Sequence, residues 1–110
     1  MAPPQISELE VLVLMAILHL ADRREDANGS AIRAEIEART GRPVPRGSIY
    51  VTLDRLSAKR LLTSTLVASS PGRRPKRLFA VNAAGTAAVR RSVTTLVNMH
   101  RGLEPIGGDT

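Results

Sequence analysis

The stretch RGSIYVTLDRLSAKR, residues 46–60, is followed directly by LLTSTLVASSPGRRPKRLFAV, residues 61–81. Ile49, Leu53 and Leu56 recur at the spacing that places side chains along one face of a helix. We therefore expect a helix over residues 46–60 whose apolar face is buried. At a rotation of 100° per residue, the opposite face of this helix lies away from the core. It carries Gly47, Val51, Asp54, Arg55 and Ala58.

The second half of this stretch predicts a β-hairpin. Residues 62–69 are rich in Thr, Leu and Val, which favours a strand. Ser70-Pro71-Gly72 is a turn signal, and residues 76–81 are expected to form the returning strand. The tip of the hairpin, residues 70–75, and the residues just after it carry a cluster of cations, Arg73, Arg74, Lys76 and Arg77.

Upstream, the sequence predicts a first helix over residues 8–21. Ser7 and Glu10 stand at the spacing of a capping box, in which each side chain accepts a hydrogen bond from the other residue's backbone N–H. The helix that follows is apolar on most of its faces, so most faces must be covered. In a chain of 110 residues, part of that cover is expected to come from a second copy.

Two further helices complete the predicted order. A second helix is expected over residues 30–39, after the cap residues Asn28-Gly29-Ser30 and before Gly41, which suits a left-handed position at a helix end. A last helix is expected over residues 83–100, with Asn82 as its N-cap. Its apolar stripe follows helical spacing through Val89, Val93, Leu96, Val97 and His100.

The order helix, helix, helix, hairpin, helix predicts a fold class. It is mostly α with a small β-hairpin, in the arrangement of a winged helix-turn-helix with three helices, a two-stranded wing and a C-terminal dimerisation helix. We expect the winged domain to span residues 1–81 and the dimerisation helix residues 82–103. Residues 104–110 are expected to be a disordered tail, because Gly and Pro are frequent there.

The distribution of charge indicates a polyanionic partner. The net charge is +6, yet residues 42–77 hold nine Lys and Arg against the single acidic residue Asp54. A basic excess confined to one third of the chain is typical of a surface that binds nucleic acid. The alternative interpretation is a solvated cationic face that aids solubility.

Composition excludes several other classes. The chain has no Cys, and its two His residues have no nearby carboxylates, so we expect neither a disulfide nor a metal site. No catalytic triad, phosphate-binding Gly loop or pair of carboxylates occurs at a usable spacing, so we expect neither an enzyme nor a cofactor. The apolar run over residues 11–20 is too short to span a bilayer. The sequence thus predicts a cytoplasmic protein without a membrane partner.

In a winged helix-turn-helix the third helix enters the major groove and the wing contacts the DNA backbone. Double-stranded DNA is therefore the predicted partner. The predicted DNA-binding residues lie on the second and third helices, in the segment between them and on the wing, namely Ser30, Arg42, Arg46, Ser48, Tyr50, Val51, Arg55, Lys59, Arg73, Arg74 and Lys76.

Two motifs at the right separation resemble the PadR-type transcriptional regulators over nearly the whole chain. Gly47-Ser48-Ile49-Tyr50-x-x-Leu53-x-Arg55-Leu56 is similar to the family's recognition-helix signature, and Pro71 to Arg77 followed by Asn82-Ala83-Ala84-Gly85 is similar to its wing and last helix. Gly29 at the opening of the second helix also fits. The chain departs from the pattern at three positions, with Val51 for the usual Pro, Arg60 for a Gly and Asn82 for a Thr.

The resemblance implies a homodimeric regulator of the short-C-terminus branch, most simply a repressor on a palindromic operator. Its half-sites would lie about one helical turn, ~34 Å, apart. The first and last helices would form the interface, through Leu9, Leu12, Val13, Val89, Val93, Leu96, Val97 and His100. Related proteins respond to phenolic or drug-like compounds. This chain has only Tyr50 and Phe79 as aromatics, so we expect no small-molecule effector or an aliphatic one.

Three alternatives stay open at this point. The winged helix could be a protein–protein interaction module without specific DNA binding. Tyr50 could hydrogen-bond a phosphate or pack its ring against the hairpin. Arg55 could contact DNA or form a surface ion pair with Asp54 or with Glu residues of the second helix.

Overall fold

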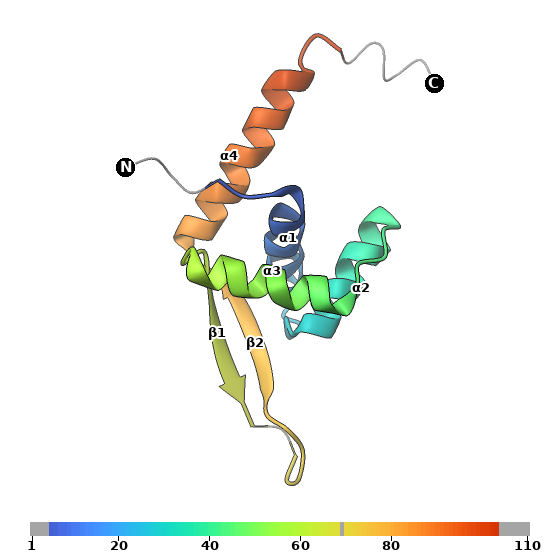
Figure 1. Cartoon of the computed structure of the whole chain (residues 1–110), viewed down its shortest axis with the longest axis vertical. Helices are drawn as coiled ribbons and strands as arrows, with labels where there is room; N and C mark the ends of the chain where they lie inside the picture. The colour runs from blue at the N-terminus through green and yellow to red at the C-terminus, as the bar shows by residue number, and fades with distance from the viewer. Residues whose placement is uncertain (1–4, 69, 104–110) are drawn as a thin grey trace.

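The computed structural model of the chain describes residues 5–68 and 70–103, so the tail predicted over residues 104–110 lies outside the described residues. The elements follow the predicted order (Figure 1). They are α1 (Glu8–Asp22), α2 (Gly29–Thr40), α3 (Arg46–Ala58), β1 (Leu62–Val67), β2 (Lys76–Val81) and α4 (Ala83–His100).

The helix starts rest on the caps that the sequence predicts. The Ser7 Oγ accepts from the backbone N–H of Glu10, and a Glu10 carboxylate oxygen accepts from the N–H of Ser7 at 2.8 Å, so the capping box is confirmed. Asn28 caps α2 through its side-chain oxygen, which accepts from the N–H of Ala31. Gly41 ends α2 in the left-handed region, with φ of 71°. This position favours glycine because a Cβ is strained there.

The predicted end of the third helix was wrong by two residues. α3 ends at Ala58, because Arg60 adopts a left-handed φ of 59° and turns the chain into β1. Asn82, the N-cap of α4, donates a side-chain hydrogen bond to the carbonyl of Arg60 at 2.9 Å. Arg60 is the position where the resemblance led us to expect Gly, and its backbone conformation is one that Gly adopts without strain.

One apolar core joins the first three helices to the base of the hairpin. Its largest fully buried side chains come from all three helices and from the turn before β1, namely Leu14, Ile17, Ile32, Ile49, Leu53, Leu56, Leu61 and Val13. Burying each Leu or Ile stabilises the fold by about 1.5–3 kcal/mol. The predicted stripe of α3, through Ile49, Leu53 and Leu56, therefore faces this core, and the opposite face of α3 stays exposed.

The hairpin is an antiparallel pair in which Leu62 lies opposite Val81 and Val67 lies opposite Lys76. Its base is held to the body, because the backbone N–H of Phe79 donates to the carbonyl of Ala27 in the loop between α1 and α2 at 3.0 Å. Most of β1 is exposed. β1 ends at Val67, short of the predicted residue 69, which lies outside the described residues.

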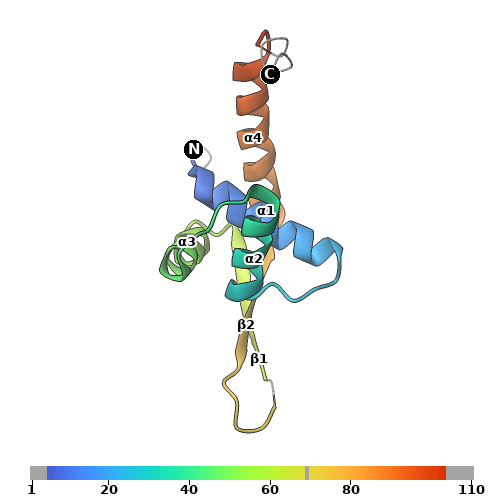
Figure 2. The same ribbon diagram turned by 90° about the vertical axis from the view of Figure 1, so that its right-hand side faces the viewer.

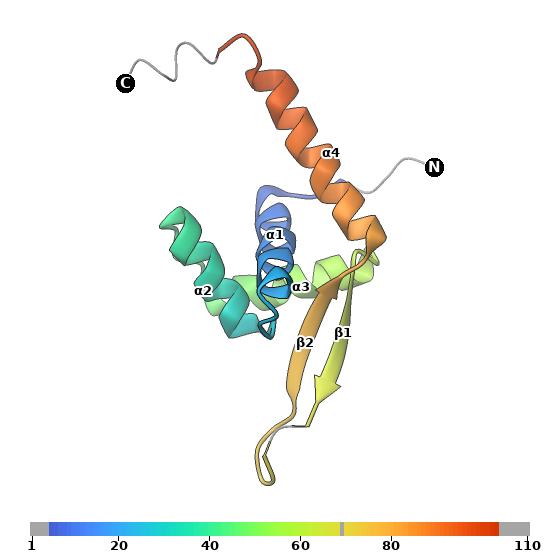
Figure 3. The same ribbon diagram turned by 180° about the vertical axis from the view of Figure 1, so that it is seen from behind.

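The hairpin and α4 extend in opposite directions from the three-helix body (Figure 1, Figure 3). Only the first half of α4 packs on the body, where Gly85, Ala88 and Val89 are buried. Among the described residues, no helix combines the length and the apolar character that crossing a membrane requires.

Candidate nucleic-acid interface

The exposed face of α3 carries the predicted groove-reading side chains. Arg46, Val51 and Arg55 are exposed, and Ser48 is half-buried. The acidic neighbour Asp54 is exposed on the same side. Within the described part of the chain, Arg55 makes no ion pair with Asp54 or with α2, so its guanidinium is available for another anion. α3 lies at one side of the body, where α1 and α2 leave its outer face uncovered (Figure 2).

Tyr50 lies against the first turn of α2. A Cβ built on Gly29 would stand 2.6 Å from the Tyr50 hydroxyl oxygen and 2.7 Å from its Cζ, so the ring occupies the space that the glycine leaves. Neither predicted placement of the Tyr50 ring included this contact. The ring remains 40% exposed, and the guanidinium carbon of Arg46 lies 5.8 Å from its centroid, within cation–π range.

The hairpin tip supplies the second set of cations. Arg73, Arg74, Lys76 and Arg77 are all exposed, and the tip lies at the opposite end of the molecule from the C-terminal end of α4 (Figure 1). The turn is closed by a hydrogen bond from the N–H of Arg73 to the carbonyl of Ser70 at 3.1 Å, and Gly72 holds a φ of 82°. Four cations at the end of a slender hairpin form a surface that suits a phosphate backbone.

Two predicted DNA-binding cations are held by the protein itself. The Lys59 ammonium donates to both carboxylate oxygens of Glu10, at 3.0 and 2.8 Å, and to the carbonyl of Gln5 at 2.9 Å. The Glu10 side chain is only 5% exposed and the Lys59 side chain is 32% exposed, so the pair joins a buried carboxylate to a partly exposed ammonium. Arg42 pairs with Glu8 at 2.6 Å on the surface. Lys59 therefore has a structural role in the protein, and Glu8 would compete with a DNA phosphate for Arg42.

The remaining predicted DNA-binding residue is Ser30. It is exposed in the first turn of α2, directly after Gly29. The N–H groups of a helix start and its partial positive charge favour an anion such as a phosphate. Gly29 was not among the predicted site residues. The sequence carried two signals for it, the fit of this glycine to the family pattern and its place at a helix start where Ala would serve the helix better.

The residues predicted for dimerisation divide into two groups. Val13 is fully buried in the core of its own chain, so its assignment to an interface was wrong. Val89 is also buried, and Leu9 and Leu12 are half-buried against the core. Val93, Leu96, Val97 and His100 are exposed along α4, and Met99 is 76% exposed.

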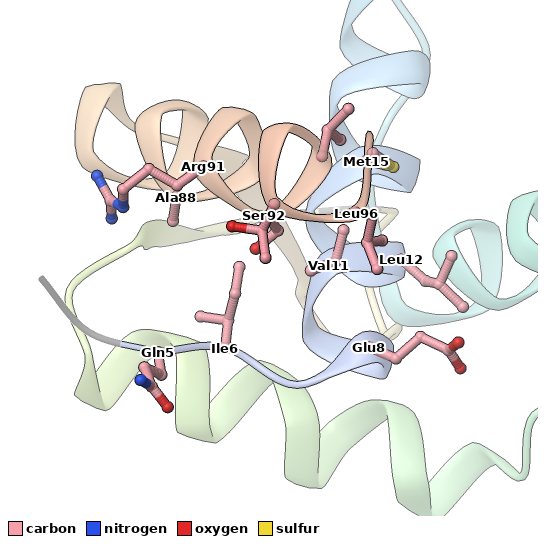
Figure 4. Close-up of a pocket in the computed structure, with 12 residues that line it drawn as sticks. Gln5, Ile6, Glu8, Val11, Leu12, Met15, Ala88, Arg91, Ser92 and Leu96 are labelled. Carbon is pink, nitrogen blue, oxygen red and sulfur yellow. The ribbon is translucent and has the colours of Figure 1, made fainter. Parts of the chain in front are cut away.

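A groove of about 720 Å³ runs between α1 and α4. Figure 4 shows Val11, Leu12 and Met15 of α1 facing Ser92 and Leu96 of α4 across it. Ile6 lies at its floor on the segment before α1 (Figure 4). The groove and the exposed stripe of α4 are continuous through Val93 and Leu96, which belong to both.

Among the residues that the structure describes, no three His, Cys, Asp or Glu side chains gather in the way that a metal site requires. The ionisable groups with shifted pKa values lie in ion pairs away from the outer face of α3. Hydrogen bonds from Arg23 and Arg39 lower the pKa of Glu35 to about 2. These groups therefore stabilise the body and do not mark a site of acid–base chemistry.

Comparison with solved structures supports the same fold. A transcriptional regulator from Thermoplasma acidophilum superposes with a TM-score of 0.69 at 17% identity, covering 93% of this chain and 96% of the other. A PadR family transcriptional regulator from Eggerthella lenta superposes with a TM-score of 0.63 at 22% identity, covering 93% of this chain and 89% of the other. Bacillus subtilis PadR, solved in complex with operator DNA, gives 0.66 at 15%, covering 79% of this chain and 47% of that longer one.

Comparison of sequences identifies the family. No curated protein matches the sequence closely enough to count as a relative. The sequence profile described as the Transcriptional regulator PadR-like family matches residues 17–91, which include α2, α3, the hairpin and the start of α4. The chain therefore belongs to the PadR-like family of transcriptional regulators, and its class is regulatory rather than enzymatic.

Proposed function

We propose that the protein is a sequence-specific DNA-binding repressor that acts as a homodimer on a palindromic operator. The observation that carries the proposal is the joint exposure of Arg46 and Arg55 on α3, of Arg73 at the hairpin tip and of Lys76 just after the tip. These cations lie on two elements that a winged helix-turn-helix presents to DNA. The protein–protein alternative gives no reason for cations to gather on these two elements.

The two elements would divide the work of binding. A major groove admits a single helix such as α3, and there an arginine such as Arg55 can donate two hydrogen bonds to the O6 and N7 of a guanine. Such a contact discriminates between bases. The wing cations would neutralise phosphates or place an arginine in the minor groove, and these contacts add affinity for any sequence.

The dimer would form through α4 and the groove between α1 and α4. Leu96, Val97 and Met99 are 68%, 48% and 76% exposed in the single chain. An apolar stripe of this kind, continuous with an apolar groove, suits a second copy related by a twofold axis. α4 extends away from the hairpin, so pairing of two α4 helices would leave both wings accessible (Figure 1).

Because the groove between α1 and α4 borders the proposed dimer interface, an effector would bind there, in the cleft between the two copies. The described lining contains Ile6, Val11, Leu12, Met15 and Leu96 and no aromatic side chain. This composition suits an aliphatic compound, because stacking on an aromatic ligand requires aromatic partners.

Footprinting on the DNA upstream of the protein's own gene tests the proposal. We expect protection of an inverted repeat whose half-sites are about one helical turn apart, and reduced transcription from that promoter in a purified system. If the folded, dimeric protein protected no sequence in this DNA, the result would contradict sequence-specific DNA binding and would favour the protein–protein alternative.

A further inference from the structure

Gly29 is buried at the first position of α2, directly after the N-cap Asn28. Its φ is not in the left-handed region that the glycines at 41, 72 and 102 adopt. The backbone at this position therefore accepts any L-residue. A helix start also gains nothing from glycine, which is a weaker helix former than alanine. The reason for glycine at residue 29 must therefore be steric: the space that a side chain would occupy is taken by another group.

That space is filled by the ring of Tyr50. The three atoms nearest to a Cβ on Gly29 would all belong to this ring, with Cε1 at 3.0 Å and the hydroxyl oxygen and Cζ closer still. Real Cβ atoms do not approach heavy atoms at 2.6–2.7 Å, so a side chain at residue 29 and the present ring position exclude one another. The ring in turn lies 5.8 Å from the guanidinium carbon of Arg46.

We propose that Gly29 is a positioning residue for the DNA-binding surface, because its missing side chain seats Tyr50 against α2 and the seated ring holds Arg46 at the start of α3. This inference rests on the proposed function. It adds that the first turn of α2 and the first turn of α3 form one unit. Tyr50 links them, so the N-terminal end of the recognition helix is ordered before DNA arrives.

The expected effect of Gly29→Ala follows from what the new Cβ would meet. The far end of a tyrosine that is 40% exposed can swing toward solvent, so the fold should tolerate the change. Gly85 offers the contrast. A Cβ there would stand 2.1 Å from the backbone carbonyl oxygen of Leu61, which cannot move without disturbing the turn into β1. Gly85→Ala should lower Tm by about 5 °C or more, whereas Gly29→Ala should leave Tm at or above that of the wild type.

The position of the ring can be read without DNA. Tyr50 is the only tyrosine and the chain has no tryptophan, so its fluorescence reports on this side chain alone. We expect acrylamide to quench the Gly29→Ala variant more efficiently than the wild type, because the displaced ring is more exposed. Equal quenching in the two proteins would overturn the inference.

The consequence for DNA is tested by a double-mutant cycle on an operator duplex. Gly29→Ala should weaken operator binding about tenfold, because this is the change in affinity expected when one charge-assisted hydrogen bond to DNA is lost. In a Tyr50→Ala background the same change should have no further effect, because the ring that the Cβ displaces is gone. An equal loss in both backgrounds would show that Gly29 acts without Tyr50 and would also overturn the inference.

Failure of this inference can be told apart from failure of the proposed function. A wild-type protein that binds no DNA would refute the proposed function, and the quenching experiment would still decide whether Gly29 seats the ring. A wild type that binds DNA, with additive losses in the cycle, would refute the role of Gly29 alone.

Discussion

The ammonium nitrogen of Lys59 lies 3.0 and 2.8 Å from the two carboxylate oxygens of Glu10. It also donates to the carbonyl of Gln5 at 2.9 Å. Glu10 is at the same time the third helical residue of α1, which closes the capping box with Ser7. One carboxylate thus joins the segment before α1, α1 itself and the C-terminal end of α3, so it holds α3 to the body.

Lys59→Met should lower the free energy of unfolding by about 1–3 kcal/mol, because it leaves the Glu10 carboxylate buried without its cation. Arg42→Met is the matched control, since it breaks the exposed pair with Glu8 and should cost less than about 1 kcal/mol. Urea denaturation at one protomer concentration measures both. Equal losses in the two variants would show that burial of the Glu10 carboxylate has no special role.

Acid should weaken the fold through Glu10 and Glu35. Burial raises the pKa of Glu10, but hydrogen bonds from Lys59 and Ser7 outweigh it and hold the pKa below the ordinary value of 4.5. The pKa of Glu35 is lowered to about 2 by Arg23 and Arg39. A carboxyl group whose pKa is lower in the folded state than in the unfolded state stabilises the protein at any pH above its unfolded-state pKa. This stabilisation is lost as the pH falls through its folded-state pKa.

The free energy of unfolding should therefore decrease as pH falls from about 5 toward 2. The double variant Glu10→Gln/Glu35→Gln should be less stable at pH 7 and should show a shallower decrease. Urea denaturation at a series of pH values measures both slopes. A decrease as steep in the variant as in the wild type would assign the acid sensitivity to other groups.

Arg55 and the wing should affect specificity differently. Arg55→Ala should cost about 1–3 kcal/mol on the operator and less on random DNA, because it removes a contact to a base. Arg73→Ala/Arg74→Ala should weaken binding to both duplexes alike, because phosphates are the same in every sequence. Fluorescence anisotropy on the two duplexes at one salt concentration measures the difference.

Arg101→Ala is the control for loss of charge alone, since Arg101 is exposed and directly follows α4. The C-terminal end of α4 lies at the opposite end of the molecule from the hairpin tip (Figure 1). This variant should leave both affinities nearly unchanged. If Arg55→Ala and the wing variant lost the same factor on both duplexes, the division between base reading and backbone contact would be wrong.

Leu96→Glu should convert the dimer to monomers in sedimentation experiments, because a carboxylate in an apolar interface would be desolvated. Leu66→Glu is a matched control. Leu66 is 63% exposed and Leu96 is 68% exposed, but Leu66 lies on β1 of the hairpin, which extends away from α4 (Figure 1). A Leu96→Glu protein that remained dimeric would remove α4 from the interface, and a monomeric Leu66→Glu protein would place the interface elsewhere.

Local signals in the sequence predicted the elements well. The capping box at Ser7 and Glu10, the cap Asn82 and the left-handed Gly41 each act over a few residues, so their spacing alone locates the ends of α1, α2 and α4. The exposed face of α3 followed from its 3.6-residue period. The end of α3 was missed because an arginine, unlike a glycine, does not predict the left-handed conformation that Arg60 adopts.

Contacts between distant segments could not be predicted. Lys59 has the same charge and near-helix position as a DNA-binding lysine, and only the fold brings Glu10 to it across 49 positions of sequence. Val13 lies on an all-round apolar helix, where periodicity does not tell the buried side from the side left for a partner. The seat of Tyr50 on Gly29 likewise depends on how α2 and α3 pack.

The dependence of DNA affinity on salt tests the proposed function most directly. If a dimer neutralises six to ten phosphates through α3 and the wing, affinity should fall about 10³- to 10⁵-fold between 50 and 200 mM salt. The titration uses the wild-type chain and the duplex upstream of its own gene. The result that supports DNA binding is a straight line of steep negative slope in log affinity against log salt, and a flat response would contradict it.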